Sequence, residues 1–498
     1  MELQFDKSIC KSLHKVLSHV SDQELTQEIR LPESLPDIGR ILGCWGQVIL
    51  RSKEWYSGST GVSGGIMVWV VYVSDDGSDV RSVDTWIPFQ MKWDIPESQR
   101  DGVICAVPLT KSVDARTVSA RKIMVRANVS IQAQAYESRE TGICKADRYP
   151  EDLQVLNQTY HLELPVEAGE KTVQIEDVLQ IQDYVQNAES LYYYELRPQL
   201  TETRILGDKL LFRGVANFHV MYRNSDNTLI TSDQELPFSQ YTHLDNVYNT
   251  EVSADAYPVV TGLELDFSGE KPMVKAGVAV QYVIYEPKAI EITEDVYSIT
   301  RNVVSETESL QIFSKLDSVT EDLCFTHKFA VQPRGILDVV CYPGHAEKVQ
   351  NGDKTEIEQP VVVQILYKDP EENLQCAIAL EKQTWVLPSD PGNSVTVEVE
   401  AVTDLQKEII SDGVTVTAKM QLRAVTCSEN GLPMTNMVSI KDEKEVDPSR
   451  ASLIVRKIGS GSVWNIAKQY GAKVSDIKAI NKFDDTPDSE QVLLIPLP

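Results

Sequence analysis

Beyond residue 30, apolar positions along the chain alternate with polar ones or form continuous runs rich in β-branched residues. Three such runs cover residues 64–73, 218–222 and 361–367, and each is followed by a polar segment typical of a turn. Strict alternation places one side of a strand against a core and the other against solvent. The pattern therefore predicts antiparallel sheets and a mainly β fold.

The strand pattern repeats along the chain at a long interval. Tyr72, Tyr222 and Tyr367 lie at or near the ends of the three runs, at intervals of 150 and 145 positions. A second strand type recurs at residues 126–136, 275–285 and 417–425. These intervals predict three tandem antiparallel β-sandwich-like domains, each long enough to bury its own core. The expected limits are 1–150, 151–300 and 301–448, followed by a small module over 449–498.

The first thirty residues follow a different period. Phe5, Ile9, Leu13 and Val16 recur at helical spacing. This spacing predicts an N-terminal helix ahead of the strands of the first domain. Each β-sheet that follows this segment is expected to have one solvent-exposed face and one buried face.

The last fifty residues predict a strand, two helices and a closing strand. Ser462 is a suitable N-cap, and the apolar residues that follow it lie on one helix face. Gly471 ends this helix, and Ser475 is expected to cap the next one. Residues 453–455 and 492–496 supply the two strands. The fold class is thus mainly β with a small βααβ module at its end.

Composition and charge argue against several classes of function. The 498 residues carry a formal net charge of −27, which opposes binding to nucleic acid. No segment has the run of about 20 apolar residues needed to cross a bilayer. The N-terminal segment lacks the apolar stretch of a secretory signal, so synthesis in the cytosol and reduced cysteines are expected.

Known catalytic motifs are missing from the sequence. It contains no phosphate-binding P-loop, no HExxH zinc motif, no GxSxG elbow and no cysteine or histidine spacing typical of a metal site. We therefore expect no enzymatic activity and no cofactor. The alternative of a cell-wall hydrolase that uses the last module for targeting lacks a catalytic constellation.

Residues 453–498 resemble the LysM family, on the matching positions 464–467, 470–471, 474, 476–477, 480–481 and 493–496. LysM modules usually bind N-acetylglucosamine glycans between two loops. The first loop here, 459–464, lacks the aspartate that the family commonly has. An aromatic side chain such as that of Trp464 could equally anchor a protein. The expected partner-binding residues are Ile458, Gly459, Ser462, Val463, Trp464, Ile466 and Asn481.

The whole chain is similar to the SipL-type spore coat morphogenetic proteins, which have SPOCS-domain repeats and a C-terminal LysM module. Residues 31–42 look like the SPOCS opening signature, with weaker traces at 174–179 and 334–337. The resemblance implies a non-enzymatic scaffold and adaptor in the mother-cell cytoplasm, at the forespore surface in the spore coat. The implied partner is stage IV sporulation protein A, the coat-scaffold ATPase, bound through the LysM module.

Two further points stay open from the sequence. The β domains could self-associate or bind other coat proteins through their edge strands. The rival interpretation is a protein that binds peptidoglycan glycans and anchors the chain to the cell wall or cortex.

Overall fold

The computed structural model describes residues 2–96, 101–249, 251–351, 354–387, 394–445, 451–457, 462–482 and 492–497. Nearly all of the elements in these ranges are antiparallel strands, so the predicted mainly β fold is confirmed. The strands fall into three successive groups, which we call the first, second and third units. Their bounds are given below, and the domain limits expected from the sequence stay a prediction.

The first unit comprises β1 (Asp6–Arg30), β2 (Ile38–Tyr56), β3 (Ser59–Ser74), β4 (Val80–Asp94), β5 (Gly102–Ser119) and β6 (Lys122–Lys145). The second comprises β7 (Leu153–Val178), the 3-10 turn η1 (Ala188–Ser190), β8 (Leu191–Arg223), β9 (Leu229–Tyr248), β10 (Ser253–Asp266) and β11 (Met273–Ser298). The third comprises β12 (Arg301–Phe329), β13 (Gly335–Pro343), β14 (Glu347–Asn351), β15 (Lys354–Lys368), β16 (Leu374–Leu387), β17 (Ser394–Ile410) and β18 (Gly413–Glu443).

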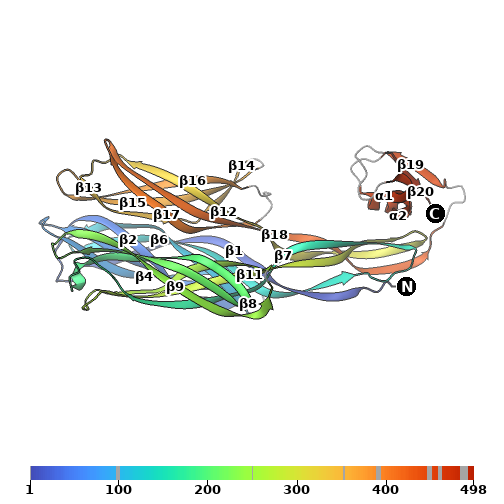
Figure 1. Ribbon diagram of the computed structural model, residues 1–498, viewed down its shortest axis with the longest axis horizontal. Helices are drawn as coiled ribbons and strands as arrows, with labels where there is room; N and C mark the ends of the chain where they lie inside the picture. Colours follow the sequence, from blue (N-terminus) through green and yellow to red (C-terminus); the bar gives the residue numbers. More distant parts are fainter. Residues whose placement is uncertain are drawn as a thin grey trace.

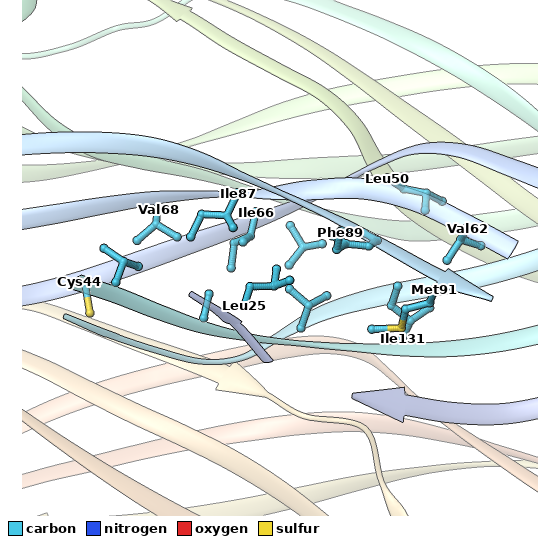
Figure 2. Close-up of a cluster of buried hydrophobic side chains, with 14 of the residues drawn as sticks. Leu25, Cys44, Leu50, Val62, Ile66, Val68, Ile87, Phe89, Met91 and Ile131 are labelled. Atoms are coloured by element: carbon cyan, nitrogen blue, oxygen red, sulfur yellow. The ribbon is translucent and has the colours of Figure 1, made fainter. Parts of the chain in front are cut away.

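One pairing order recurs in all three units. The first strand of each unit pairs with its last strand, which pairs with the strand before it: β1-β6-β5, β7-β11-β10 and β12-β18-β17. The remaining strands of each unit form a second antiparallel sheet. Buried aliphatic side chains fill the space between the two sheets. Figure 2 shows this core in the first unit, which includes Ile66 and Val68 of β3, Ile87 of β4 and Ile131 of β6.

The predicted N-terminal helix is wrong, because residues 6–30 form strand β1. This strand pairs with β6 over its whole length, from Asp6 opposite Lys145 to Arg30 opposite Lys122. Ile9, which the helical spacing placed on an apolar face, is 65% exposed. An irregularity in the register between Lys15 and Leu17 breaks the alternation of the strand. The long partner strand supplies backbone hydrogen bonds that outweigh local helix spacing.

The expectation of one wet and one dry face per sheet fails for β3. Ile66 and Val68 point into the first unit's own core, whereas Trp69 and Val71 pack against side chains of the other two units. The continuous apolar run over 64–73 therefore reflects burial on both faces, as such runs do in sheets that are covered on both sides.

Two of the repeated tyrosines fix equivalent loops. The Tyr72 hydroxyl donates to the carbonyl of Pro36 at 3.1 Å, and the Tyr222 hydroxyl donates to that of Gln182 at 2.8 Å. The next carbonyl in each loop also accepts a backbone hydrogen bond. Asp37 accepts the N–H of Asp75, and Asp183 accepts the N–H of Ser225. The counterpart of segment 31–42 is thus the loop around Asp183. The match expected at 174–179 is wrong, because residues 174–178 lie within β7.

The three polar turns after these strands are also alike. Gly77, Asn227 and Glu372 each have a positive φ, of 71°, 62° and 66°. Each donates its backbone N–H to the residue three positions earlier, which closes the turn. An Asn tolerates this left-handed conformation because its short polar side chain bonds locally, whereas Glu is unusual there.

The three units close a ring. In the second unit, Gln281 accepts from the backbone N–H of Ala106 in the first at 2.8 Å and donates to its carbonyl at 2.9 Å. In the third unit, Arg423 donates to the carbonyl of Ala256 in the second at 3.4 Å. Gln132 of the first unit donates to Glu398 of the third, also at 3.4 Å. Each unit therefore contacts both others through buried polar groups.

The long strands continue beyond the ring as three two-stranded ribbons that pack against one another. We call this narrower part the stalk and the ring of units the body; Figure 1 shows the stalk extending to one side of the body. Apolar residues from all three units fill the stalk, namely Cys10, Ile143, Leu164, Ile290, Leu310 and Leu432, with Leu3, Leu153, Val296 and Ile440 in a second cluster nearer its tip.

The C-terminal module lies beside the stalk tip (Figure 1). It comprises β19 (Leu453–Lys457), α1 (Val463–Tyr470), α2 (Val474–Asn481) and β20 (Val492–Pro496), with β19 and β20 paired antiparallel. No helix in the described ranges is long and apolar enough to cross a membrane.

Candidate functional site

Helix α1 of the module is built as the sequence predicts. The Ser462 hydroxyl accepts the backbone N–H of Asn465 at 3.2 Å and so caps the helix. Gly471 ends it in the left-handed conformation, with φ of 62°. The predicted cap of the second helix is wrong: α2 begins at Val474, so Ser475 lies in its first turn. The N-cap position is occupied by Lys473, whose side chain makes no capping hydrogen bond.

The module's own core takes up several of the expected partner-binding residues. Val463 and Ile466 are buried, at 6% and 7% exposed, against residues of α2 and β20. The Asn481 side chain donates to the carbonyls of Ile477 and Leu494 and accepts the N–H of Leu494 at 2.8 Å. These three residues hold the module together. Ile458 and Gly459 lie outside the described residues.

Trp464 faces the stalk tip. Its indole Nε1–H donates to the carboxylate of Asp295 at 2.8 Å, and its ring stands edge-on to Tyr297 with 4.9 Å between the ring centroids. Lys468, one turn further along α1, places its ammonium 2.7 and 2.8 Å from the two Asp295 oxygens. The Trp464–Lys468 face of the module is thus in contact with an acidic and an aromatic side chain of β11.

Tyr297 is part of the stalk tip and also of the apolar core of the C-terminal module. It is 5% exposed and packs within the apolar core of the module, while its hydroxyl donates to the carbonyl of Ala472 at 2.8 Å. Burial, and then the charge of Asp295, raise the pKa of this hydroxyl well above its ordinary value. The phenol therefore stays protonated and acts as a hydrogen-bond donor. Next to Tyr297, Lys444, which directly follows β18, donates to the carbonyl of Ser298 at 2.6 Å and so links the third unit to the second.

Sequence reasoning identified Trp464 but missed Asp295 and Tyr297. They lie about 170 positions from Trp464 along the chain, at the end of a strand that otherwise reads as one of many. No local motif marks them. Only the pairing of β7 with β11 brings this part of the chain to the stalk tip.

A second candidate region is the place where the three units meet. A cavity of about 230 Å³ lies there, lined by matching segments of β2, β8 and β13 together with β5, β10 and β17. Its charged side chains are paired within the protein: Arg197 contacts Glu195 at 2.5 Å, and Arg423 contacts Glu400 at 2.9 Å. Each of these two ion pairs lies within one unit, and the cavity marks the joint at which the three units meet.

Burial alters protonation around this joint. It raises the pKa of the Glu398 carboxyl to about 8, despite the opposing charge of Arg423. It lowers the pKa of His345 to about 4, so this imidazole is neutral at pH 7. His345 accepts the backbone N–H of Gln132 at 3.2 Å and thus links the third unit to the first. Within the described residues, no three His, Cys, Asp or Glu side chains gather as a metal site.

The architecture defines a chain of three joined β units with a stalk and a small terminal βααβ module. A family model described as "SipL, SPOCS domain" matches residues 187–268, which run from η1 to the end of β10 in the second unit. This match supports a SipL-like family and indicates a protein related to sporulation. No curated protein and no solved structure matches the chain.

Proposed function

We propose that this chain is a non-enzymatic scaffold and adaptor of endospore coat assembly, which tethers the coat to the forespore by binding stage IV sporulation protein A through its C-terminal module. The match of the second unit to the SipL SPOCS domain carries the proposal. The recurring strand order extends the likeness to the first and third units, since all three pair their strands in one order. The module, with its βααβ order, takes the place of the LysM domain.

The role assigned to each part follows from its physical character. The body joins its units through buried polar contacts and offers a rigid platform. The stalk holds the module away from that platform. On the proposed scheme the protein works in the mother-cell cytoplasm, at the forespore surface, with no cofactor.

Trp464 is the residue that tests this proposal most directly. We expect the full chain to bind purified stage IV sporulation protein A, and Trp464→Ala to weaken that binding by at least about tenfold, as a buried tryptophan anchor does. Surface-immobilised ATPase and a concentration series of each variant give the dissociation constants. Tyr56→Ala is the matched control, because Tyr56 is an aromatic on the body with 52% exposure.

The competing glycan interpretation has its own readout. The wild-type chain and Trp464→Ala, both folded by circular dichroism, are mixed with insoluble peptidoglycan and sedimented. Retention of the wild-type chain on peptidoglycan, combined with no binding to the ATPase, would replace the adaptor proposal by cell-wall anchoring.

A further inference from the structure

The contact between module and stalk tip is a small, chemically specific recognition site. The module contributes an indole N–H and an ammonium group one helical turn apart, from Trp464 and Lys468. The stalk contributes a carboxylate and a phenol two positions apart on one strand, from Asp295 and Tyr297. Residues at i and i+4 of a helix share a face, as do residues at i and i+2 of a strand. The two elements therefore present matching pairs.

Charge favours an acidic surface as the natural counterpart of this face. Residues 449–498 hold seven Lys and Arg against five Asp and Glu, whereas the whole chain carries a net charge of −27. Among the described residues of α1, α2 and their flanks, Lys468, Lys473, Lys478 and Lys482 outnumber the single carboxylate of Asp476. The module is thus a basic element attached to an acidic chain, and complementary charges steer its encounters.

The charged pair of this contact is also partly open to water, whereas Tyr297 is buried. The Asp295 side chain is 23% exposed and that of Lys468 is 44% exposed. Water can hydrate both groups when they separate, so opening does not leave a charge buried without a partner. A joint of this kind separates more readily than one whose charged groups are sealed from solvent.

We propose that the Trp464–Lys468 face recognises protein surfaces that combine a carboxylate with an aromatic ring, that Asp295 and Tyr297 fill this face within the chain, and that an external partner binds by displacing them. The identity of that partner rests on the proposed function. Because of the internal contact, the face is free in only a fraction of the molecules. The apparent affinity of the module for the partner is the intrinsic affinity multiplied by that fraction. The stalk tip is therefore an internal competitor.

Asp295→Ala is the variant that exposes the face, since it removes the carboxylate that bonds to Trp464 and Lys468. We expect it to bind stage IV sporulation protein A about tenfold more tightly than the wild-type chain, which corresponds to a face that is free in about a tenth of the molecules. Glu291→Ala is the matched control: Glu291 lies on the same strand and pairs with Lys145 within the stalk, at 2.8 Å. It should bind as the wild type does.

A charge exchange separates masking from damage. Asp295→Lys and Lys468→Glu should each release the module, and the double variant should restore an ion pair and reclose it. Closure is read from the backbone amide resonance of Lys473 in the ¹⁵N-labelled full chain, because the carbonyl of the same peptide group, that of Ala472, accepts the Tyr297 hydroxyl, and Tyr297 is unchanged in these variants. We expect this resonance to move in each single variant and to return toward the wild-type position in the double variant.

The outcomes distinguish this proposal from the proposed function. Tighter binding by Asp295→Ala together with the resonance shift supports both. A resonance unchanged by Asp295→Ala, or equal binding by both chains, overturns the masking while the adaptor role stands. If the resonance shifts but neither chain binds the ATPase, the adaptor role fails, and the displacement fails with it because this partner does not compete with the stalk tip.

Discussion

The body and the stalk tip each place an aspartate against a lysine, yet the two pairs differ in exposure. In the body, Asp255 contacts Lys315 at 3.2 Å with side chains only 3% and 6% exposed. At the tip, Asp295 contacts Lys468 with side chains 23% and 44% exposed. The first pair has lost its water and depends wholly on its protein partners. The second keeps an alternative partner in solvent.

This difference shows which joints of the chain are permanent. A buried ion that loses its partner stays in a medium of low dielectric, which costs several kcal/mol. A partly exposed ion that loses its partner is hydrated instead, and the net cost is about 1 kcal/mol or less. The units of the body are therefore locked together, whereas the module is held by a contact that a competing surface could replace.

The largest effect is expected from Asp255→Ala in the body. Asp255 also accepts from Arg423 at 3.0 Å, so its removal takes a carboxylate from two buried cations: Lys315 loses its ion-pair partner, and Arg423 keeps only Glu398 and Glu400. We expect the free energy of unfolding to fall by about 3–5 kcal/mol. Urea denaturation followed by circular dichroism measures the change.

A surface pair provides the contrast for Asp255. Asp322 contacts Lys419 at 2.7 Å with side chains 42% and 34% exposed, so Asp322→Ala should cost less than about 1 kcal/mol. If Asp255→Ala lowered the free energy of unfolding by no more than Asp322→Ala does, the conclusion that buried ion pairs hold the units of the body together would be wrong.

A pH-dependent effect of intermediate size is expected at His345. Its pKa of about 4 in the folded chain lies below the ordinary value of 6.5, so the unfolded chain takes up the proton first as pH falls. Stability contributed by the neutral imidazole is present above pH 6.5 and lost between pH 6.5 and 4, up to about 3 kcal/mol. Besides burial, which lowers this pKa, the charges of Asp22 and Lys111 act on it in opposite directions, since Asp22 raises it and Lys111 lowers it.

His345→Gln tests this dependence, because an amide is neutral throughout the range. The free energy of unfolding of the wild type should fall more steeply than that of the variant between pH 6.5 and 4. Other carboxylates titrate in both chains and cancel in the difference. His243→Gln, at a side chain 64% exposed, should leave the slope unaltered. Parallel curves for wild type and His345→Gln would show that the histidine is not held neutral.

The fold followed from the sequence where local pattern and packing agree. The runs ending at Tyr72 and Tyr222 are strands, and the turns after them close through residues of positive φ. The pattern failed where long-range pairing prevails. Residues 6–30 show helical spacing, yet β6 offers a partner strand of equal length. Alternation also could not reveal that other units cover the outer face of β3.

The sequence predicted the part of the candidate site that lies on the module but not the part that lies on the stalk. The module and its tryptophan stand out because capping and helix periodicity are local signals, as at Ser462 and Gly471. Asp295 and Tyr297 carry no such signal, since their role arises from the register of β11 on β7 and from the place where the stalk ends. A sequence pattern does not encode which residues meet across such distances.

Of the Asp255, His345 and Tyr297 substitutions, Tyr297→Phe at the stalk tip should have the smallest effect. The substitution removes one hydrogen bond, to the carbonyl of Ala472, and keeps the ring against Trp464. We expect a cost of about 1 kcal/mol, confined to the module. Hydrogen exchange of the α1 amides should therefore quicken about fivefold, while urea unfolding of the body stays unchanged. Tyr160→Phe, which removes a hydroxyl contact to Glu294 within the stalk, should leave α1 exchange as it is. Faster exchange throughout the body of the Tyr297 variant would mean that the tip joint is as permanent as the ring, and the comparison between them would fail.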